Sequence, residues 1–402
     1  MSPQWMDKLV IPSRTKIVFL IMDGLGGLPL EGKPGTELET AITPHLDALA
    51  GGGVCGLLDP IAPGITPGSG PAHFALFGYD PVINNVGRGL LSAAGLDFPM
   101  TERDLFMRVN FATLNSDGQV IDRRAGRIDT ETNERLCRKL SAGIRPALGT
   151  EVFFATEKEH RALIVLRGDN LREEISETDP QQTGLPPLAP EALMTEASGT
   201  ADLLADLLNQ AKTVLADEPK ANMILLRGYS RYHRFDPMPE RFGLAPLAIA
   251  SYPMYRGIAR LLGMAVYSPT STLEEEIAGM ETAWQDYDFF FVHVKPTDSR
   301  GEDGDFDAKV KAIEAVDALI PRITALSPDV LIVTGDHSTP AALASHSWHP
   351  VPVLLSARTC RPDRVEHFGE GDCLSGGLGR MPMSSLMTVA LAHAGRLTKF
   401  GA

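Results

Sequence analysis

The chain contains 402 residues, which predicts two or three domains because a single hydrophobic core rarely grows beyond roughly 250–300 residues. With 44% hydrophobic and 22% charged residues, it has the composition of an ordinary globular protein that needs no disulfides to form a core. The net charge of −14 argues against a nucleic-acid partner, which would require a basic face. A small anionic ligand stays compatible with it, since a few arginines or metal ions dominate a site at short range.

Cysteine spacing and hydropathy indicate the compartment. Cys55, Cys137, Cys360 and Cys373 form no C-x-x-C pair, which disfavours a zinc knuckle or a thioredoxin-like motif and fits reduced thiols. The longest apolar runs are strand-length rather than membrane-length, and the first residues lack the pattern of a signal peptide. We therefore expect a cytoplasmic protein without a membrane partner.

Three short apolar runs are each followed by polar residues that can bind a metal; the runs are residues 16–22, 288–295 and 329–334. The polar residues are Asp23, Asp298, Asp336 and His337. Continuous apolar runs of this length are typical of parallel strands buried on both faces. Ligands of open α/β sheets bind beyond the carboxyl ends of the strands, so we expect these side chains to converge there.

Helical patterns alternate with these runs, at residues 43–50, 273–284, 306–319 and 384–394. Thr43 suits an N-cap and Pro44 a first helical turn. The middle of the chain differs, because its strands do not end in Asp or His; the expected elements there are strands at 152–155, 162–166 and 222–226, a Pro-rich stretch at 179–190 and a helix at 191–216.

This order of elements predicts an α/β protein with a mostly parallel sheet flanked by helices. Residues 1–110 and 268–402 form the two parts of a discontinuous catalytic domain, and residues 111–267 form an inserted α+β domain. The glycines 24, 26 and 27 lie near the first strand, but they lack G-x-G-x-x-G spacing and are followed by Pro29, which disfavours a dinucleotide site.

A Gly- and Pro-rich loop, residues 63–73, presents the hydroxyl of Ser69 just before an expected helix at 72–77. Helix N-termini attract anions, so this serine suits a nucleophile that attacks phosphorus. The alternative is a serine that only caps the helix. A G-x-S-x-G elbow is missing, which disfavours an acyl hydrolase. A hydroxyl nucleophile needs a base or a metal to activate it.

Carboxylates and imidazoles cluster late in the chain; they are Asp298, Glu302, Asp336, His337, His346 and His349. Such ligands suit Mn²⁺, Zn²⁺ or a mixed pair of ions. Two ions about 4 Å apart clamp a phosphoryl group, polarise its oxygens and activate a hydroxyl. Asp23 is either a further ligand or a turn residue that accepts backbone donors. The residues together indicate metal-dependent phosphoryl transfer.

Motifs spread through most of the chain carry a family resemblance; they include Ile21-Met-Asp-Gly-Leu-Gly, Leu76-Phe-Gly-Tyr-Asp-Pro, Ile121-Asp-Arg-Arg-Ala-Gly-Arg-Ile, Thr334-Gly-Asp-His-Ser-Thr-Pro and Gly376-Gly-Leu-Gly-Arg. In these segments the chain resembles the 2,3-bisphosphoglycerate-independent phosphoglycerate mutases, in their archaeal-type branch within the alkaline phosphatase superfamily. The resemblance implies an alkaline-phosphatase-like fold, with the insert as a cap that grips glycerate and closes over the site. It also implies interconversion of 2- and 3-phosphoglycerate in glycolysis.

The resemblance further implies roles for individual residues. Ser69 would be the nucleophile that carries a transient phosphoserine. One ion would be held by Asp23, Ser69, Asp336 and His337, and the other by Asp298, Glu302 and His346. Mn²⁺ is the expected metal, with Mg²⁺, Zn²⁺ and Co²⁺ as alternatives.

Two departures from the family pattern stand out. The family motif Asp-x-x-x-His reads Asp298-Ser-Arg-Gly-Glu302 here. Glu302 is the preferred ligand because its spacing matches, and it would harden the site; His349 is the alternative. The family motif Gly-Ser-Asp-Thr-Ser-His reads Gly68-Ser-Gly-Pro-Ala-His73. This second change is the best support for the alternative function, a phosphomonoesterase or a phosphotransferase acting on another small hydroxylated metabolite. A non-catalytic binding protein is disfavoured, since nearly every ligand position is filled.

Arginines are the expected ligands of the phosphorylated substrate, because their forked, permanently charged donors match phosphate and carboxylate. The candidates are Arg123, Arg124, Arg127, Arg227 and Arg256. Any one of them is otherwise a solvated surface residue, but the resemblance favours a substrate role for Arg123, Arg127 and Arg227. Asp122 and Asp179 are candidates for the acid/base group that serves the glycerate hydroxyls.

Overall fold

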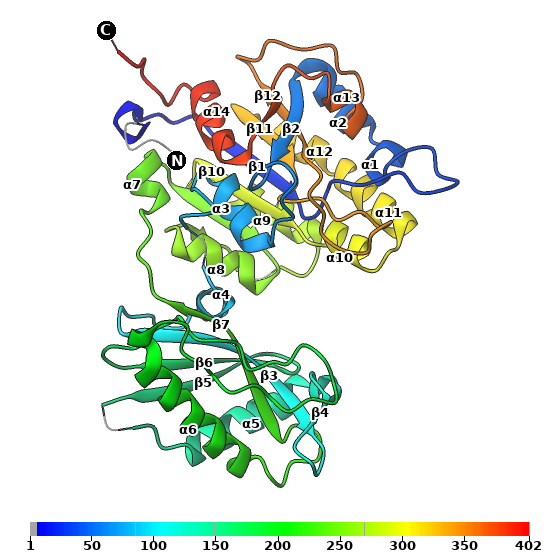
Figure 1. Cartoon of the computed structure of the whole chain (residues 1–402). Coiled ribbons are helices and arrows are strands. Elements are labelled where there is room, and N and C mark those ends of the chain that lie inside the picture. The colour runs from blue at the N-terminus through cyan, green and yellow to red at the C-terminus, as the bar shows by residue number, and fades with distance from the viewer. Residues whose placement is uncertain (1–5, 85, 148, 269, 402) are drawn as a thin grey trace. The chain divides into compact units, whose positions relative to one another are not determined.

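The computed structural model describes residues 6–84, 86–147, 149–268 and 270–401. The chain divides into two compact units: unit 1 is Met1–Asn85 with Phe235–Ala402, and unit 2 is Val86–Arg234. Figure 1 colours unit 1 blue at its start and yellow-green to red at its end, and unit 2 cyan to green. Among the described residues, no helix is long and apolar enough to cross a membrane.

The inserted unit therefore begins and ends earlier than the expected range of 111–267. At its start, β3 (Asp104–Leu114) is one continuous strand of unit 2, so the expected boundary falls inside it. At its end, β8 (Pro246–Ala250) pairs in parallel with β10 in the sheet of unit 1. No carboxylate or histidine follows β8, so its sequence lacks the pattern that predicts other strands of the catalytic sheet.

Unit 1 contains an eight-stranded sheet with the order β13-β2-β12-β11-β1-β10-β8-β9. The three strands expected from the apolar runs are neighbours, and both β10 and β11 pair in parallel with β1. Only β12 runs antiparallel to its two neighbours. The strands are β1 (Ile17–Met22), β2 (Val54–Asp59), β8, β9 (Ala265–Val266), β10 (Phe289–Val294), β11 (Val330–Thr334), β12 (Val351–Ala357) and β13 (Gly379–Pro382).

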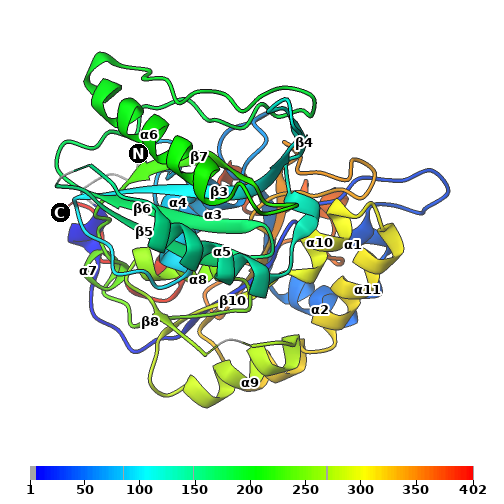
Figure 2. The same ribbon diagram turned by 90° about the horizontal axis from the view of Figure 1, so that it is seen from below.

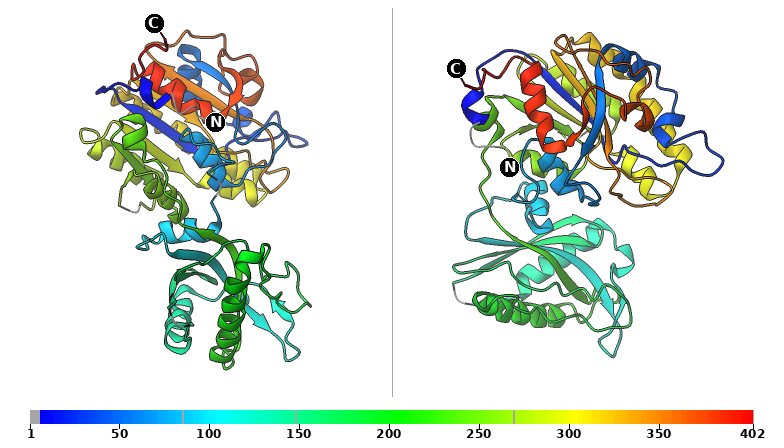
Figure 3. Two further views of the ribbon diagram at one scale, coloured as in Figure 1. Left: turned by 60° about the vertical axis from the view of Figure 1, so that its left-hand side comes forward. Right: turned by 45° about the horizontal axis from the view of Figure 1, so that its top comes forward.

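Helices cover both faces of this sheet, as β10 illustrates (Figure 3). Successive side chains of a strand point to opposite faces. His293 lies against Tyr255 of α8 (Pro253–Leu261) and His73 of α3 (Ser69–Leu76), with ring centroids 3.7 and 5.3 Å away. On the other face, Phe290 stacks on Trp284, just beyond α9 (Leu273–Ala283), with ring centroids 4.9 Å apart. The predicted α/β class, a mostly parallel sheet flanked by helices, is confirmed.

The expected helices of unit 1 are present within a few residues of their predicted bounds, at 43–50, 273–284, 306–319 and 384–394. The helices are α1 (Glu37–Thr40), α2 (Pro44–Gly52), α3 (Ser69–Leu76), α7 (Met238–Phe242), α8 (Pro253–Leu261), α9 (Leu273–Ala283), α10 (Pro296–Glu302), α11 (Phe306–Asp317), α12 (Ile320–Ala325), α13 (Glu370–Cys373) and α14 (Leu386–His393).

Unit 2 contains an antiparallel sheet with the order β4-β3-β6-β5, in which β7 also pairs with β3. Helices α5 and α6 lie side by side on one face of it (Figures 2 and 3). Besides β3, the helices and strands of unit 2 are α4 (Arg88–Gly95), β4 (Val120–Asp122), α5 (Thr130–Gly143), β5 (Glu151–Lys158), β6 (Arg161–Arg167), α6 (Ser198–Val214) and β7 (Met223–Arg231).

The core of unit 2 follows from the alternation of side chains along β3. Leu105, Met107 and Val109 pack toward α5 and α6 in one hydrophobic cluster. Arg108 and Asn110 alternate with them and therefore lie on the opposite face. This arrangement places polar strand residues on the face opposite the core, where they can line a site.

One predicted helix is shorter than expected, since residues 191–197 are not part of α6. Residues 191–193 run beside residues 174–176 instead: the Ser176 amide donates to the Glu191 carbonyl, and the Leu193 amide donates to the Glu174 carbonyl, both at 2.9 Å. The preceding Pro-rich stretch favours extended backbone, and this pairing continues it.

Glu276, on α9, makes the stability of unit 1 depend on pH. Burial raises the pKa of its carboxyl to about 7, although Thr270 donates a hydrogen bond to it at 3.4 Å. The folded state therefore holds a proton that the unfolded state releases above about pH 4.5. Stability from this group is complete below that pH and is lost as pH rises through 7.

We expect the free energy of unfolding of the wild type to fall by up to about 3 kcal/mol between pH 4.5 and 8 relative to that of Glu276→Gln, measured by urea unfolding. Parallel pH profiles for the two proteins would contradict this.

Candidate metal centre

The carboxyl ends of β1 and β11 bring three ligand residues together. Asp23 directly follows β1, and Asp336 and His337 follow β11. Their ligand atoms all lie within 4.8 Å of one another. His337 Nε2 is 3.4 Å from Asp23 Oδ1 and 3.1 Å from Asp336 Oδ2. We call these three residues the first group.

The first group fits a bound cation. Asp23 Oδ1 and Asp336 Oδ2 are buried and have no hydrogen-bond partner in the described part of the chain. The other oxygen of each carboxylate is held: Tyr255 Oη donates to Asp23 Oδ2 at 2.5 Å, and the amides of Gly24 and His337 donate to Asp336 Oδ1 at 3.0 Å. Buried carboxylate oxygens without donors are costly unless a cation compensates them.

Electrostatics point the same way. Burial, together with the neighbouring charge of Asp23, raises the pKa of Asp336 well above its usual range. Burial lowers the pKa of His337 to about 3, so its ring is neutral and offers a lone pair near neutral pH. A positive ion among these groups would reverse the shift of Asp336, since it favours the ionised carboxylate.

Ser69 completes this cluster. It is the first residue of α3, and its Oγ lies 3.2 Å from His337 Nε2. The residue at the N-cap position is Gly68, and no side-chain capping bond is present, so the alternative of a capping serine does not match the geometry. Residues 70–72, where the family motif differs, form the first turn of α3. Pro71 is compatible with that turn because early helical positions do not need its missing N–H.

A second group shares His337 with the first. Asp298, His337 and His346 offer ligand atoms within 4.8 Å of one another. His346 Nε2 is 3.6 Å from Asp298 Oδ1, and the rings of His337 and His346 stack at 3.7 Å. His346 Nδ1 lies 3.0 Å from the carbonyl oxygen of Pro67, which can only accept. The proton therefore belongs on Nδ1, and Nε2 is left with the lone pair that a metal requires.

The two candidates for the remaining ligand differ in position. Glu302 lies one helical turn after Asp298 on α10, and its Oε1 is 3.7 Å from His346 Nε2. Its side chain is 55% exposed, and it belongs to neither group. His349 also belongs to neither group, and its Nδ1 lies 3.0 Å from Ser347 Oγ. Glu302 thus has a close contact with a member of the second group, His346.

Sequence reasoning missed residues that contact one or both groups, among them the following three. Lys295 Nζ lies 2.9 Å from Asp23 Oδ2 and 2.5 Å from Asp298 Oδ2, so it links the groups. Although burial opposes it, these two carboxylates raise the pKa of Lys295. Thr339 Oγ1 donates to Asp298 Oδ1 at 2.7 Å and lies 3.0 Å from His337 Nδ1. The third is Tyr255. The sequence offered a usable signal for Lys295, because this lysine directly follows a strand of five apolar residues and a histidine.

A cavity of about 290 Å³ in unit 2 is lined by arginines. Arg123, Arg124, Arg127 and Arg227, all predicted, are among its lining residues. Sequence reasoning missed the others, which are Arg88, Arg108, Asn110, Glu159, His160 and Arg161. The alternation of Arg108 and Asn110 with core residues on β3 would have indicated them. Arg256 is not in this lining; it lies on α8 of unit 1.

Two of these arginines carry a side-chain N–H donor that is not used within the described part of the chain. The Nε atoms of Arg161 and Arg227 are buried without a hydrogen-bond partner among the described residues. Burial and the nearby arginines lower the pKa of His160 to about 4, so this histidine is neutral near neutral pH. Dense positive charge with unused donors favours an anionic ligand. We call this cavity the arginine pocket.

The two acid/base candidates lie beside the arginine pocket, but both are engaged. Arg123 donates to both oxygens of Asp179 at 2.7 Å, and this partner lowers the pKa of Asp179 against the effect of burial. Asp122 accepts from the amides of Arg124 and Gly126, at 2.7 and 2.6 Å. These contacts favour a role in holding the pocket rather than in proton transfer.

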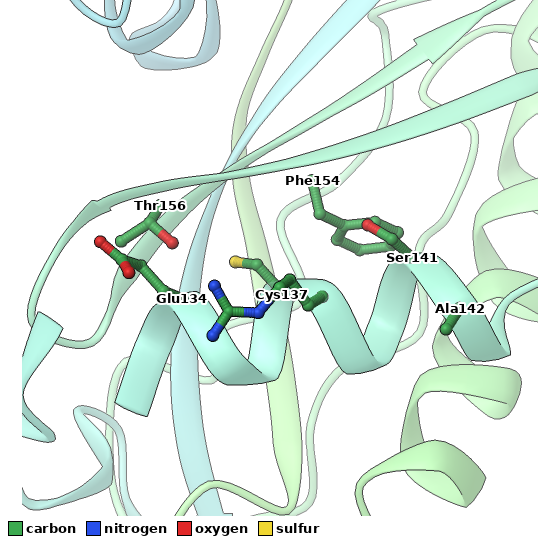
Figure 4. A pocket seen from close by; sticks show the side chains of 7 residues that line it. Glu134, Cys137, Ser141, Ala142, Phe154 and Thr156 are labelled. Carbon is green, nitrogen blue, oxygen red and sulfur yellow. The ribbon is translucent and has the colours of Figure 1, made fainter. Parts of the chain in front are cut away.

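A second cavity of unit 2, about 610 Å³, lies between α5 and β5 (Figure 4). Its lining includes Glu134 and Arg138, whose charges cancel, and Cys137. Burial raises the pKa of the Cys137 thiol to about 11, and the thiol donates to Asn133 Oδ1. A protonated, buried thiol is a poor nucleophile, so this cavity offers neither an anion site nor reactive chemistry.

Comparisons with known proteins agree with this geometry. The profile of the 2,3-bisphosphoglycerate-independent phosphoglycerate mutases matches residues 50–221. A probable enzyme of that description from Thermus thermophilus is 50% identical over 99% of this chain and 98% of its own length. One from Aquifex aeolicus is 46% identical over 98% and 99%. Among solved structures, the PH0037 protein of Pyrococcus horikoshii is 30% identical with a TM-score of 0.82, covering 96% of this chain and 99% of that protein.

A second solved structure, the cofactor-independent phosphoglycerate mutase of Thermoplasma acidophilum, is 28% identical with a TM-score of 0.73, over 94% of this chain and all of that one. The α/β sheet, the His/Asp groups and the serine at a helix start define the class, a phosphoryl-transfer enzyme with a candidate metal centre. The chain belongs to the 2,3-bisphosphoglycerate-independent phosphoglycerate mutase family, whose members are isomerases. The resemblance seen in the sequence motifs is confirmed.

Proposed function

We propose that this protein interconverts 2-phosphoglycerate and 3-phosphoglycerate, a step of glycolysis and gluconeogenesis, through a phosphoserine at Ser69. The observation that supports this proposal most is the position of Ser69 Oγ, which faces the ligand atoms of the first group at the start of a helix. Family membership favours the mutase over the phosphomonoesterase or phosphotransferase alternative.

We further propose that the centre holds two divalent ions, most readily Mn²⁺. The first would be held by Asp23, Ser69, Asp336 and His337, and the second by Asp298, Glu302 and His346. When bound, such ions neutralise charge on the phosphoryl oxygens and lower the pKa of a nearby hydroxyl. The support is the chemistry of the donors: oxygen-rich sets with one or two imidazoles suit Mn²⁺.

The chain's own residues would carry the transfer in two halves. In the first, the Oγ–H proton of Ser69 leaves, Oγ bonds to phosphorus, and the bond from phosphorus to the substrate oxygen breaks as that oxygen gains a proton. In the second, the other glycerate hydroxyl loses its proton and bonds to phosphorus, while the bond from phosphorus to Ser69 Oγ breaks and Oγ regains a proton. The N-terminus of α3 and the ammonium of Lys295 stabilise negative charge there.

Unit 2 would act as the substrate-binding cap, with the arginine pocket holding the anionic groups of the glycerate. The unused donors of Arg161 and Arg227 support this role. The assay that tests the whole proposal follows 3-phosphoglycerate conversion and phosphate release in parallel after chelation and return of Mn²⁺. Conversion without phosphate release supports the mutase, whereas release without conversion points to a phosphatase. We also propose a cytoplasmic location, in keeping with four free cysteines.

Arg227 offers a direct test of the arginine pocket. Arg227→Met should raise KM for 3-phosphoglycerate by about 10- to 100-fold, because it removes a charge-assisted hydrogen bond worth about 1.5–3 kcal/mol. Steady-state kinetics measure this. Arg135→Met is a matched control in the same unit. Arg135 pairs with Glu218 at 2.7 Å and is not among the residues that line the arginine pocket. An equal rise in KM for both variants would contradict the substrate role.

Glu302→Ala tests the choice between the two remaining ligand candidates. If Glu302 completes the second site, the variant should bind about one ion fewer per chain, because a site that loses a ligand holds its metal more weakly. Metal content after dialysis against limiting Mn²⁺ measures this. His349→Ala is the paired control and should keep the wild-type count. A loss in His349→Ala and none in Glu302→Ala would reverse the assignment.

A further inference from the structure

The glycines near the end of β1 have a structural explanation that the sequence did not reveal. Gly24 has a φ of +62°, and a Cβ there would lie 2.5 Å from Thr339 Oγ1. A Cβ on Gly27 would lie 1.9 Å from Glu37 Oε2. The loop after β1 is thus pressed against the loop after β11 on one side and against a buried carboxylate on the other.

A buried lysine lies where these loops meet. Lys309, on α11, is fully buried, and its Nζ donates to three backbone carbonyls: those of Gly24 at 2.9 Å, Gly26 at 3.1 Å and Thr339 at 2.8 Å. Gly24 is adjacent to Asp23, and Thr339 lies two residues after His337. One ammonium group therefore joins the two loops that carry the first group.

Glu37, the first residue of α1, is the partner of this lysine. It is fully buried, and its Oε1 lies 3.9 Å from Lys309 Nζ. Its two oxygens also accept from the same pair of loops: Oε2 from the Leu28 amide at 3.1 Å and Oε1 from the Ala341 amide at 2.7 Å. Both charges are thus paired and hydrogen-bonded, as a buried ion pair requires.

We propose that Lys309 and Glu37 form a clamp that positions the metal ligands Asp23, Asp336 and His337. The proposal rests on the proposed role of these three residues. An α1–α11 ion pair that stabilised only the packing of the helices would need no contact with the ligand loops. Lys309 and Glu37 make five hydrogen bonds to the two ligand loops: three from the ammonium and two to the carboxylate. Contacts of this kind affect metal affinity, because they hold the ligand residues at the spacing and orientation that the metal requires.

The test uses the full-length protein and Mn²⁺ alone as the probe. Lys309→Met keeps the length of the side chain and removes the ammonium, and it should weaken Mn²⁺ binding by roughly 10- to 100-fold. The fraction of free Mn²⁺, followed by electron paramagnetic resonance during titration, gives the dissociation constant. Glu37→Gln, which keeps the shape of the carboxylate, should weaken binding in the same direction and serves where Lys309→Met does not fold.

Lys16→Met is the matched control. Lys16 Nζ also donates to two backbone carbonyls, those of Trp284 at 2.5 Å and Tyr287 at 2.7 Å, but it lies just before β1, at the opposite end of the strand from Asp23. This variant should lower the melting temperature and keep the wild-type Mn²⁺ affinity. Wild-type affinity in Lys309→Met or in Glu37→Gln would overturn the clamp. A wild-type protein that binds no Mn²⁺ would instead overturn the proposed metal centre itself.

Discussion

Replacing Ser69 with alanine should abolish the interconversion of 2- and 3-phosphoglycerate, with kcat lowered by about 10⁴-fold or more. The expected size follows from the loss of the nucleophile, since removing one member of a nucleophilic unit costs nearly the whole rate advantage. No other hydroxyl contacts His337 Nε2 in the described part of the chain. A coupled assay with 3-phosphoglycerate measures the loss.

Two further measurements separate a missing nucleophile from a damaged fold. Ser69→Ala should unfold at nearly the wild-type temperature, because the N-cap of α3 is Gly68 and the serine makes no capping bond. Ser299→Ala, on α10, is the control and should keep full activity. In the wild type, rapid quenching with substrate should trap a phosphoryl group on Ser69 that mass spectrometry can locate. Activity retained in Ser69→Ala, or a phosphoryl group trapped elsewhere, would disprove the assignment.

Histidine substitutions should separate the two proposed metal ions by count. His337 belongs to both groups, whereas His346 belongs only to the second. In the proposed assignment His337 holds the first ion and His346 the second, so each single variant should lose about one ion per chain and the double variant about two, since a site that loses a ligand binds its metal more weakly. Activity at limiting Mn²⁺ should fall to background in both variants, because each group contributes to the same transfer. Metal analysis after dialysis gives the counts.

His367→Ala is a suitable control for these two variants. His367 is exposed and pairs with Asp47 at 3.0 Å, away from either group. Its metal content and activity should match those of the wild type. If the double variant lost no more ions than either single variant, the two groups would form a single site, and the proposal of two separate ions would fail.

The arrangement of the catalytic sheet was largely predictable. Each of the stretches 16–22, 288–295 and 329–334 contains an unbroken apolar run, which is typical of strands covered on both faces. Such strands pair in parallel and present their carboxyl ends together, so Asp23, Asp298, Asp336 and His337 were expected to meet. His346 was found through its distance in sequence from His337 and the family motif.

The arginine pocket was predictable only in part. Arg123, Arg124 and Arg127 form one run, and Arg227 ends an apolar stretch of β7, so local patterns drew attention to them. Arg88, Arg108 and Arg161 come from separate elements, α4, β3 and β6. Their common cavity depends on which strands pair, and that is decided by contacts between residues far apart in the chain. Arg256 lies on α8 in unit 1 rather than in the inserted unit, because the expected range of the insert ended too late; its substrate role stays a prediction.

By itself, the sequence of this protein determined the α/β class, the family, and the candidate metal ligands at the ends of buried strands. These features follow from hydrophobic periodicity and from motifs, both of which are local. Only the tertiary structure decided three features: the bounds of the inserted unit, the carboxylate oxygens of Asp23 and Asp336 that lack a hydrogen-bond partner among the described residues, and the buried contacts of Lys309. A lysine in an amphipathic helix reads as a solvated residue, and only the fold shows that its charge is satisfied by carbonyls of two distant loops.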